Sequence, residues 1–128
     1  MIDHLSLPVS DIDRARAFYD KVLATVGYKR MMDFGRSAGY GDEHPHFWIG
    51  VPDGGPAEGS AAAAAGFHLA FRAPSRAAVD AFYAAALAGG GRDNGAPGLR
   101  PHYHPDYYAG FVFDPDGNRI EAVCHLTA

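Results

Sequence analysis

Apolar and polar residues alternate at the start of the chain and again halfway along it. In segment 2–9 the apolar side chains take every second position, and His4 falls on the opposite face. Segment 66–73 repeats the pattern, with His68 opposite its apolar residues. A period of two is typical of a strand that is buried on one side. The pattern therefore predicts two strands, each with a histidine on its open face.

A helix is predicted after each of these strands, because apolar residues then recur with the helical period. The two apolar stripes comprise Ile12, Ala15, Phe18, Tyr19 and Val22 in the first helix, and Val79, Phe82, Tyr83 and Leu87 in the second. Ser10 or Asp11 can cap the first helix and Ser75 the second, since their side-chain oxygens accept from free backbone N–H groups. Glycines end both helices.

Three further strands are predicted in each half. They cover 28–34, 36–41 and 46–51 in the first half, and a weak strand at 99–103, then 107–113 and 118–126, in the second. The Asp-Pro-Asp-Gly sequence at 114–117 is a strong turn signal. Segment 52–65 is rich in Gly, Pro and Ala and is interpreted as a linker.

The two halves also match each other without a gap at a spacing of 64 positions. Phe18-Tyr19 then aligns with Phe82-Tyr83, and His4 with His68. Such a register across strand and helix indicates duplication or a shared structural constraint. We therefore predict one α+β domain over 1–128, made of βαβββ modules at 1–51 and 66–128. Their curved mixed sheet would form half-barrels that close a cup.

The inner face of that sheet carries the candidate chemistry. Alternation places His4, Trp48, His68 and Glu121 on it. Two imidazoles and a carboxylate can occupy one face of an octahedral metal ion and leave the opposite face open for a substrate. The alternatives are a hydrogen-bonded strand histidine at His4, a surface carboxylate paired with Arg119 at Glu121, and a core side chain at Trp48.

These motifs resemble the vicinal oxygen chelate superfamily. The resemblance rests on the duplicated plan, Asp3-His4-Leu5, segment 66–71 and the closing Asp-Pro-Asp-Gly-Asn-Arg-Ile-Glu at 114–121. The superfamily includes glyoxalase I, extradiol ring-cleaving dioxygenases, fosfomycin-resistance enzymes and bleomycin-binding proteins. It implies a glyoxalase/dioxygenase-like fold and places the metal ligands at His4, His68 and Glu121. The metal could be Fe²⁺, Mn²⁺, Ni²⁺, Co²⁺ or Zn²⁺, since all accept imidazole and carboxylate ligands.

One position departs from that family pattern. Glyoxalase I carries a fourth ligand, a glutamate on the last strand of the first module, and the matching position here is Trp48. That glutamate helps to move a proton between adjacent carbons, so its replacement weakens the isomerase interpretation. The three-ligand pattern is closer to the dioxygenases and the fosfomycin-type transferases.

Segment 100–108 is dense in histidine and tyrosine. Tyr103 and His104 are candidate acid–base residues beside the metal, together with Glu121, because imidazole and phenol can transfer protons. Trp48, Arg100, Tyr103 and His104 are the candidate substrate contacts. The alternative is a rigid aromatic loop that packs against the barrel mouth.

Composition narrows the possible partners. The net charge of −4 over 128 residues argues against nucleic acid, which requires a basic face. No apolar run approaches the roughly 20 residues of a membrane span. The single cysteine and the lack of a signal sequence at the start lead us to expect a cytoplasmic protein. The resemblance implies a homodimer acting on a small molecule.

We therefore expect a metal-dependent enzyme in which a Lewis-acid metal holds two neighbouring oxygens of the substrate. A lyase or isomerase of glyoxalase type and a ring-cleaving dioxygenase or transferase both stay open. The alternative from another class is a metal-free protein that binds a drug or metabolite, as bleomycin-binding relatives do.

Overall fold

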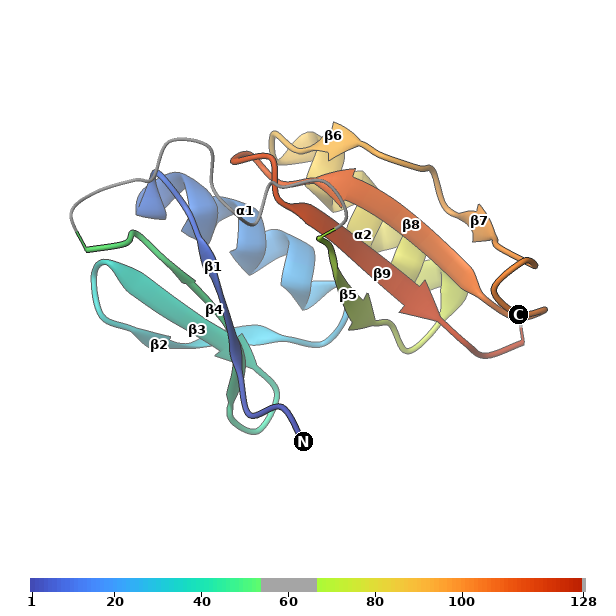
Figure 1. The fold of residues 1–128 in the computed structure, drawn as a ribbon, viewed down its shortest axis with the longest axis horizontal. Coiled ribbons are helices and arrows are strands. Elements are labelled where there is room, and N and C mark those ends of the chain that lie inside the picture. The colour runs from blue at the N-terminus through green and yellow to red at the C-terminus, as the bar shows by residue number, and fades with distance from the viewer. Residues whose placement is uncertain (54–66, 128) are drawn as a thin grey trace.

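The computed structural model describes residues 1–53 and 67–127 (Figure 1), so the predicted linker lies outside the described residues from position 54 onward. Module 1 contains β1 (Leu5–Pro8), α1 (Ile12–Ala24), β2 (Lys29–Asp33), β3 (Ser37–Gly41) and β4 (Pro45–Gly50). Module 2 contains β5 (Leu69–Arg72), α2 (Arg76–Ala88), β6 (Arg92–Asp93), β7 (Gly98–Leu99), β8 (Tyr108–Phe113) and β9 (Arg119–Cys124).

Each module forms one mixed sheet. In module 1 the strand order is β1-β4-β3-β2, and β1 runs parallel to β4 while the other pairs are antiparallel. In module 2 the order is β5-β9-β8-β6, with β7 also paired to β8. The predicted α+β fold of two βαβββ units is confirmed. The described strands form separate sheets of four and five strands that are not closed into a barrel.

Both helices begin where the sequence predicts a cap. The Asp11 carboxylate accepts from the Arg14 N–H, so Asp11 rather than Ser10 caps α1, and Ser75 accepts from the Ala78 N–H in α2. Figure 1 shows both helices behind the strands, and they contact each other as well as their own sheets. Each has 13 residues, and no helix in the described parts of the chain is long and apolar enough to cross a membrane.

The core lies between the helices and the sheets. Its largest fully buried side chains are Tyr19, Tyr40, Phe18, Phe82, Leu7, Leu23, Ile49 and Ile120. Phe71 of β5 packs edge-on against Phe47 of β4, with ring centroids 5.2 Å apart. Apolar side chains of the two modules therefore share one continuous cluster.

A polar contact also joins the modules, and we call it the closed seam. The turn after β8 docks on the junction between β1 and α1. Asp116 accepts from the Ser10 N–H at 3.0 Å and from Arg14 at 3.1 Å. The buried Asn118 donates from Nδ2 to the Pro8 carbonyl at 3.2 Å and to Asp114 at 2.9 Å. The closing Asp-Pro-Asp-Gly-Asn motif therefore fastens module 2 to module 1.

The weak strand predicted at 99–103 is corrected to β7, which covers only Gly98–Leu99. Pro101 has no N–H to donate to a ladder, and the Tyr103 N–H turns back to the Arg100 carbonyl at 2.9 Å. The short strand β6 was not predicted, because two residues carry no readable alternation.

Candidate functional site

The two sheets present equivalent positions on their open faces. Ser6 of β1 lies opposite Trp48 of β4, and Ala70 of β5 lies opposite Glu121 of β9. Because Ser6 and Ala70 are 64 positions apart, Trp48 and Glu121 occupy corresponding places in the two modules. The predicted match of Trp48 to the missing acidic position of module 1 agrees with this register.

Glu121 is the centre of the polar face. Its side chain is only 1% exposed, although it lies on the face away from α2. His68 Nε2 lies 3.1 Å from Glu121 Oε1, and the Tyr107 hydroxyl donates to Oε2. A cavity of about 310 Å³ opens beside this group and is lined by His68, Tyr103, His104, Tyr107 and Glu121. A carboxyl group buried in this way needs such partners.

Tyr107 is the functional candidate that sequence reasoning missed. Burial, and then the hydrogen bond to Glu121, raise the pKa of the Tyr107 phenol well above its ordinary value, so it keeps its proton and donates. The signal that could have found it is alternation: Tyr107 shares the parity of Phe111, which lies opposite Glu121 in the β8–β9 ladder.

A pair of imidazoles lies next to Tyr107. His104 Nε2 and His125 Nδ1 are 2.6 Å apart, and both rings meet the Tyr107 ring edge-on. His104 Nδ1 faces the Asp106 N–H at 3.1 Å and accepts from it. In the neutral pair His104 therefore carries its proton on Nε2 and donates it to His125, which is exposed.

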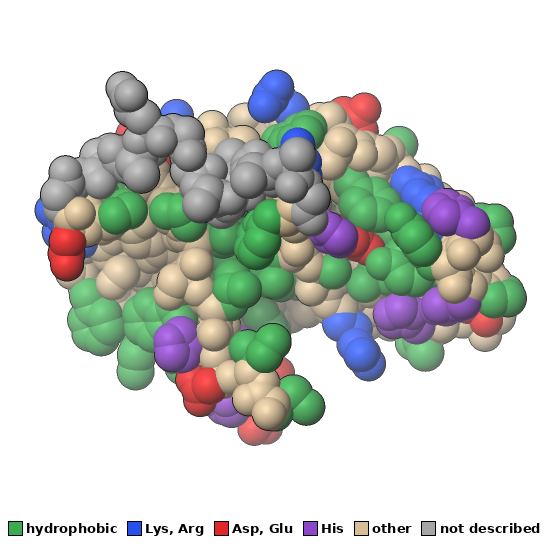
Figure 2. Space-filling view, viewed as in Figure 1, with side chains coloured by type: hydrophobic (Ala, Val, Ile, Leu, Met, Phe, Trp, Pro, Cys, Tyr) green, Lys and Arg blue, Asp and Glu red, His purple; other side chains and the backbone are tan. Residues whose placement is uncertain are grey.

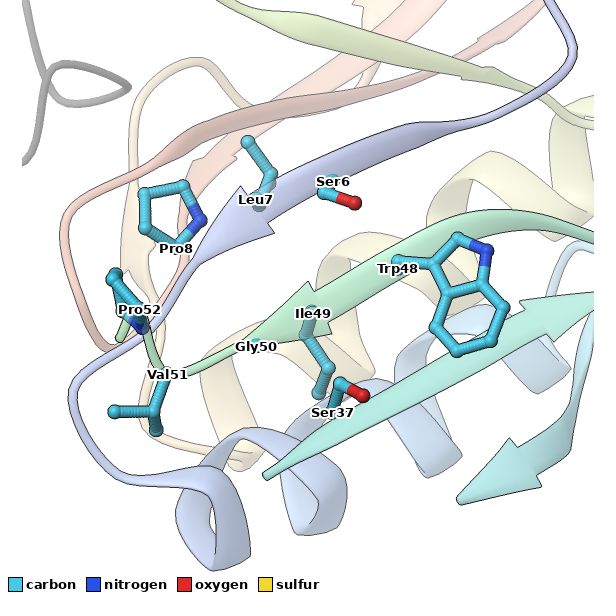
Figure 3. A pocket seen from close by; sticks show the side chains of 9 residues that line it. All are labelled: Ser6, Leu7, Pro8, Ser37, Trp48, Ile49, Gly50, Val51 and Pro52. Atoms are coloured by element: carbon cyan, nitrogen blue, oxygen red, sulfur yellow. The ribbon is translucent and has the colours of Figure 1, made fainter. Parts of the chain in front are cut away.

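The corresponding face of module 1 is aromatic. Figure 3 shows Trp48 projecting from β4 over β3, at one end of a cavity of about 390 Å³ that also includes Ser6 and Pro8. The Trp48 ring is half-buried and stacks on Phe34, with centroids 5.9 Å apart and planes 8° apart. It is a partly exposed surface ring and not a core side chain. A planar ligand could stack on it.

Three predicted site residues lie away from the Glu121 cavity: His4, Arg100 and, on the open face of module 1, Trp48. His4 is exposed, and its Nδ1 lies 2.6 Å from the Asp3 carboxylate. Arg100 donates to the Ala96 carbonyl at 2.8 Å and lies over the Phe111 ring. In residues 1–53 and 67–127, no three His, Cys, Asp or Glu side chains come together as a ligand set. The single chain brings together His68 and Glu121 but not His4.

The donor chemistry of His68 and Glu121 nevertheless fits a divalent cation. An imidazole nitrogen and a carboxylate oxygen face each other on one cavity wall, and the carboxyl group is shielded from solvent. Both are usual ligands of first-row divalent metals. Tyr107 occupies the second carboxylate oxygen and would orient it, as hydrogen bonds to metal ligands commonly do.

Comparisons with known proteins identify the family of the chain. Residues 1–122 match the family model of the Glyoxalase/Bleomycin resistance protein/Dioxygenase superfamily. The crystal structure of a glyoxalase/bleomycin resistance protein from Albidiferax ferrireducens T118 is similar, with a TM-score of 0.84 and 32% identity over 95% of this chain and 97% of that chain. No curated protein gives a significant match.

Two further crystal structures share the fold at lower identity. A glyoxalase/bleomycin resistance protein/dioxygenase family enzyme from Burkholderia phytofirmans PsJN has a TM-score of 0.74 and 20% identity, covering 98% of each chain. A glyoxalase-related enzyme from Fulvimarina pelagi has a TM-score of 0.73 and 18% identity, covering 97% of this chain and 87% of that one.

Proposed function

Because the chain belongs to the Glyoxalase/Bleomycin resistance protein/Dioxygenase superfamily, we propose that it is a divalent-metal-dependent enzyme. Its substrate would be a small molecule that binds through two neighbouring oxygens. One observation supports this most strongly: Glu121 is buried between the Tyr107 hydroxyl and the His68 imidazole on the wall of an open cavity. A shielded carboxyl group beside an exposed imidazole suits a cation site better than a structural ion pair.

In this proposal His4, His68 and Glu121 hold the metal, which is Fe²⁺, Mn²⁺, Ni²⁺, Co²⁺ or Zn²⁺. A bound metal would supply Lewis acidity to the substrate oxygens. His4 is apart from the other two ligands in the single chain. The proposed homodimer would bring His4 of one copy to the His68–Glu121 pair of the other across a symmetric interface, so that each copy contributes to both sites.

The residues around the cavity have separate roles in the proposed reaction. Tyr107 keeps its proton and fixes the Glu121 carboxyl group. Tyr103, which is 60% exposed, and His104 contact the substrate at the cavity wall. His104 can pass a proton across its 2.6 Å contact to the exposed His125. Trp48 and Arg100 lie outside this cavity and would contact only a larger substrate.

The open face of module 1 bears on the reaction type. At the place corresponding to Glu121 it carries Trp48, which cannot accept a proton from carbon. Proton transfer between adjacent carbons is therefore poorly supported. Ring cleavage by a dioxygenase, or transfer chemistry, needs no second carboxylate there, and we propose it ahead of the isomerase and lyase reactions.

Metal content tests the proposal directly. Protein purified without chelators should contain about one transition metal ion per chain by mass spectrometry, since one ligand set is proposed per chain. His68→Ala and Glu121→Gln should each lose most of it. His102→Ala is the matched control, because His102 is an exposed histidine that does not line the cavity. An unchanged metal content in both site variants would refute the metal site.

Subunit mixing tests the shared site. His4→Ala and His68→Ala should each be metal-poor, whereas a refolded mixture should regain metal in the heterodimers. One of the two sites in such a heterodimer carries both substitutions and the other carries none. A site formed within one chain would gain nothing from mixing.

A metal-free binding protein is the second candidate, and the Phe34–Trp48 stack favours it. Trp48 is the only tryptophan in the chain, so its fluorescence reports on this face alone. Stoichiometric quenching by an aromatic drug, with no turnover and no metal, would favour this candidate over the enzyme.

A further inference from the structure

The duplicated plan should produce two equivalent seams between the modules, but only one is closed. At the closed seam, Ser10 and Arg14 both donate to Asp116 of the opposite turn. The residues 64 positions later are Pro74 and Ala78. Pro74 has neither an N–H nor a hydroxyl group to donate, and Ala78 has no guanidinium group. The second seam therefore lacks the donors that close the first.

A cavity of about 620 Å³ lies at this second seam, which we call the open seam. It is lined by Val26, Tyr28, Asp42, Arg72, Ala73, Pro74, His125 and Leu126. Asp42 follows β3 as Asp114 follows β8, so the turn between β3 and β4 corresponds to the turn between β8 and β9. The β3–β4 turn faces the junction between β5 and α2 across this cavity. Figure 2 shows the surface hollowed between the two modules in the lower middle of the view. The volume lies within the usual 300–1,000 Å³ or so of small-molecule sites.

Asp42 of module 1 and Arg72 of module 2 carry opposite charges and both line this cavity. Among the described residues, no ion pair joins the two. The Arg72 side chain is exposed and forms no hydrogen bond or ion pair with any described residue. Asp42 accepts from the Glu43 N–H at 2.7 Å and contacts His46 at 3.3 Å, both at Oδ1. Hydrogen bonds, first from the Glu43 N–H and then from its own backbone N–H and from His46, hold the pKa of Asp42 below its ordinary value, so this carboxylate is charged at neutral pH.

Apolar side chains line most of the rest of this cavity. Val26 and Ala73 are buried, the Tyr28 ring is half-buried, and Leu126 is exposed. A ligand that satisfies all of these groups has a carboxylate, a cationic nitrogen and an apolar body. Arginine binds carboxylates through two parallel hydrogen bonds, and an ammonium group pairs with a carboxylate.

We propose that the open seam is a second binding site, for a small zwitterion of the apolar amino-acid class. Its carboxylate pairs with Arg72, its ammonium group with Asp42, and its side chain packs on Tyr28 and Leu126. This site is distinct from the Glu121 cavity, since the two share no lining residue. A ligand there bridges the modules at the seam that the protein itself leaves unfastened.

The test uses three matched probes on the full chain by calorimetry: phenylalanine, 3-phenylpropionate and 2-phenylethylamine. We expect phenylalanine to bind at least about tenfold more tightly than either single-charge analogue, because only it satisfies both charges. Arg72→Gln and Asp42→Asn should each weaken phenylalanine about tenfold or more. Arg92→Gln is the control, because Arg92 is an exposed arginine on β6 away from the cavity.

Amide chemical shifts locate the bound probe. Phenylalanine should shift the amide resonances of Val26, Ala73 and Leu126. The metal content of Arg72→Gln should equal that of the wild type, which separates this site from the proposed metal centre. No binding of phenylalanine up to its solubility would overturn the proposal. Equal binding of 3-phenylpropionate would overturn the zwitterion, and an unaltered affinity in Arg72→Gln would overturn the site.

Discussion

The two modules share one backbone plan but differ on their open faces. Module 1 pairs Trp48 with Gly39 on the neighbouring strand, and module 2 pairs Glu121 with Phe111 at the corresponding place. Each pair combines one aromatic ring with a residue that has none. The ring is on the last strand in module 1, at Trp48 of β4, and on the strand before the last in module 2, at Phe111 of β8. Duplication therefore constrains the buried face, whereas the open face can be aromatic in one module and polar in the other.

The modules differ in a second way, at their junctions. Ser10, Arg14 and the turn at 114–118 close one seam, whereas Pro74 and Ala78 leave the other open. Hydrogen-bond donors decide this difference, since the apolar core is continuous on both sides. The polar residues beside the core therefore determine that one seam is closed by hydrogen bonds and that the other contains a cavity.

The largest effect is expected from Asn118→Ala, which removes the buried donor of the closed seam. The substitution deletes the bonds from Nδ2 to the Pro8 carbonyl and to Asp114. It should lower the free energy of unfolding by about 3 kcal/mol, since the buried Asp114 carboxyl group and the partly buried Pro8 carbonyl each lose a donor. Urea denaturation measures this, and Asn94→Ala, an exposed asparagine, is the control. A loss no larger than that of the control would mean that apolar packing alone joins the modules.

Tyr107→Phe tests the polar face of module 2. The variant loses the hydroxyl that donates to Glu121, and the free energy of unfolding should fall by about 2 kcal/mol at neutral pH. Tyr103→Phe, which alters an exposed phenol in the same cavity, should change it far less. Equal losses in the two variants would show that the Glu121 carboxyl group does not depend on Tyr107.

The same variant should show a distinct pH dependence. The pKa of Tyr107 is raised in the folded protein from 10.0, first by burial and then by its bond to Glu121. Its contribution to stability is therefore fully present below pH 10 and is lost as the pH rises through the folded pKa. The stability difference between wild type and Tyr107→Phe should shrink above pH 10. Denaturation midpoints between pH 8 and 11 check this, and a constant difference would contradict it.

Gly39→Ala tests the aromatic face of module 1. A Cβ at this position would lie 2.9 Å from three atoms of the Trp48 ring, so the ring must move off the strand and away from Phe34. We expect a loss of about 1–2 kcal/mol, typical of overpacking, and a shift in the Trp48 emission maximum. Gly50→Ala is the control on β4, since a Cβ there finds only ordinary contacts from 3.5 Å. Unchanged emission in Gly39→Ala would show that Gly39 does not support the ring.

The sequence predicted the backbone plan because the periods of two and 3.6 are set locally, and the caps Asp11 and Ser75 follow from one residue each. Alternation also placed Glu121 and His68 on one face correctly. The parity that Tyr107 shares with Phe111 marks it as a candidate, but alternation could not show which aromatic side chain of segment 100–108 donates to Glu121, since a local period does not encode contacts between side chains of neighbouring strands. Nor could it place His4 relative to His68, which depends on how two separate sheets are packed.

The smallest effect is expected from Arg14→Ala, which gives module 1 the residue type that module 2 has at Ala78. The Arg14 side chain is 47% exposed, and its 3.1 Å ion pair with Asp116 is screened by water. Such pairs are worth about 0.5 kcal/mol, and the loss should disappear in urea denaturation at high salt. Arg14→Lys, which keeps the charge, should retain part of it. If Arg14→Ala instead cost as much as Asn118→Ala, the ion pair and not the buried amide would close the seam, and Ala78 alone would then explain why its counterpart is open.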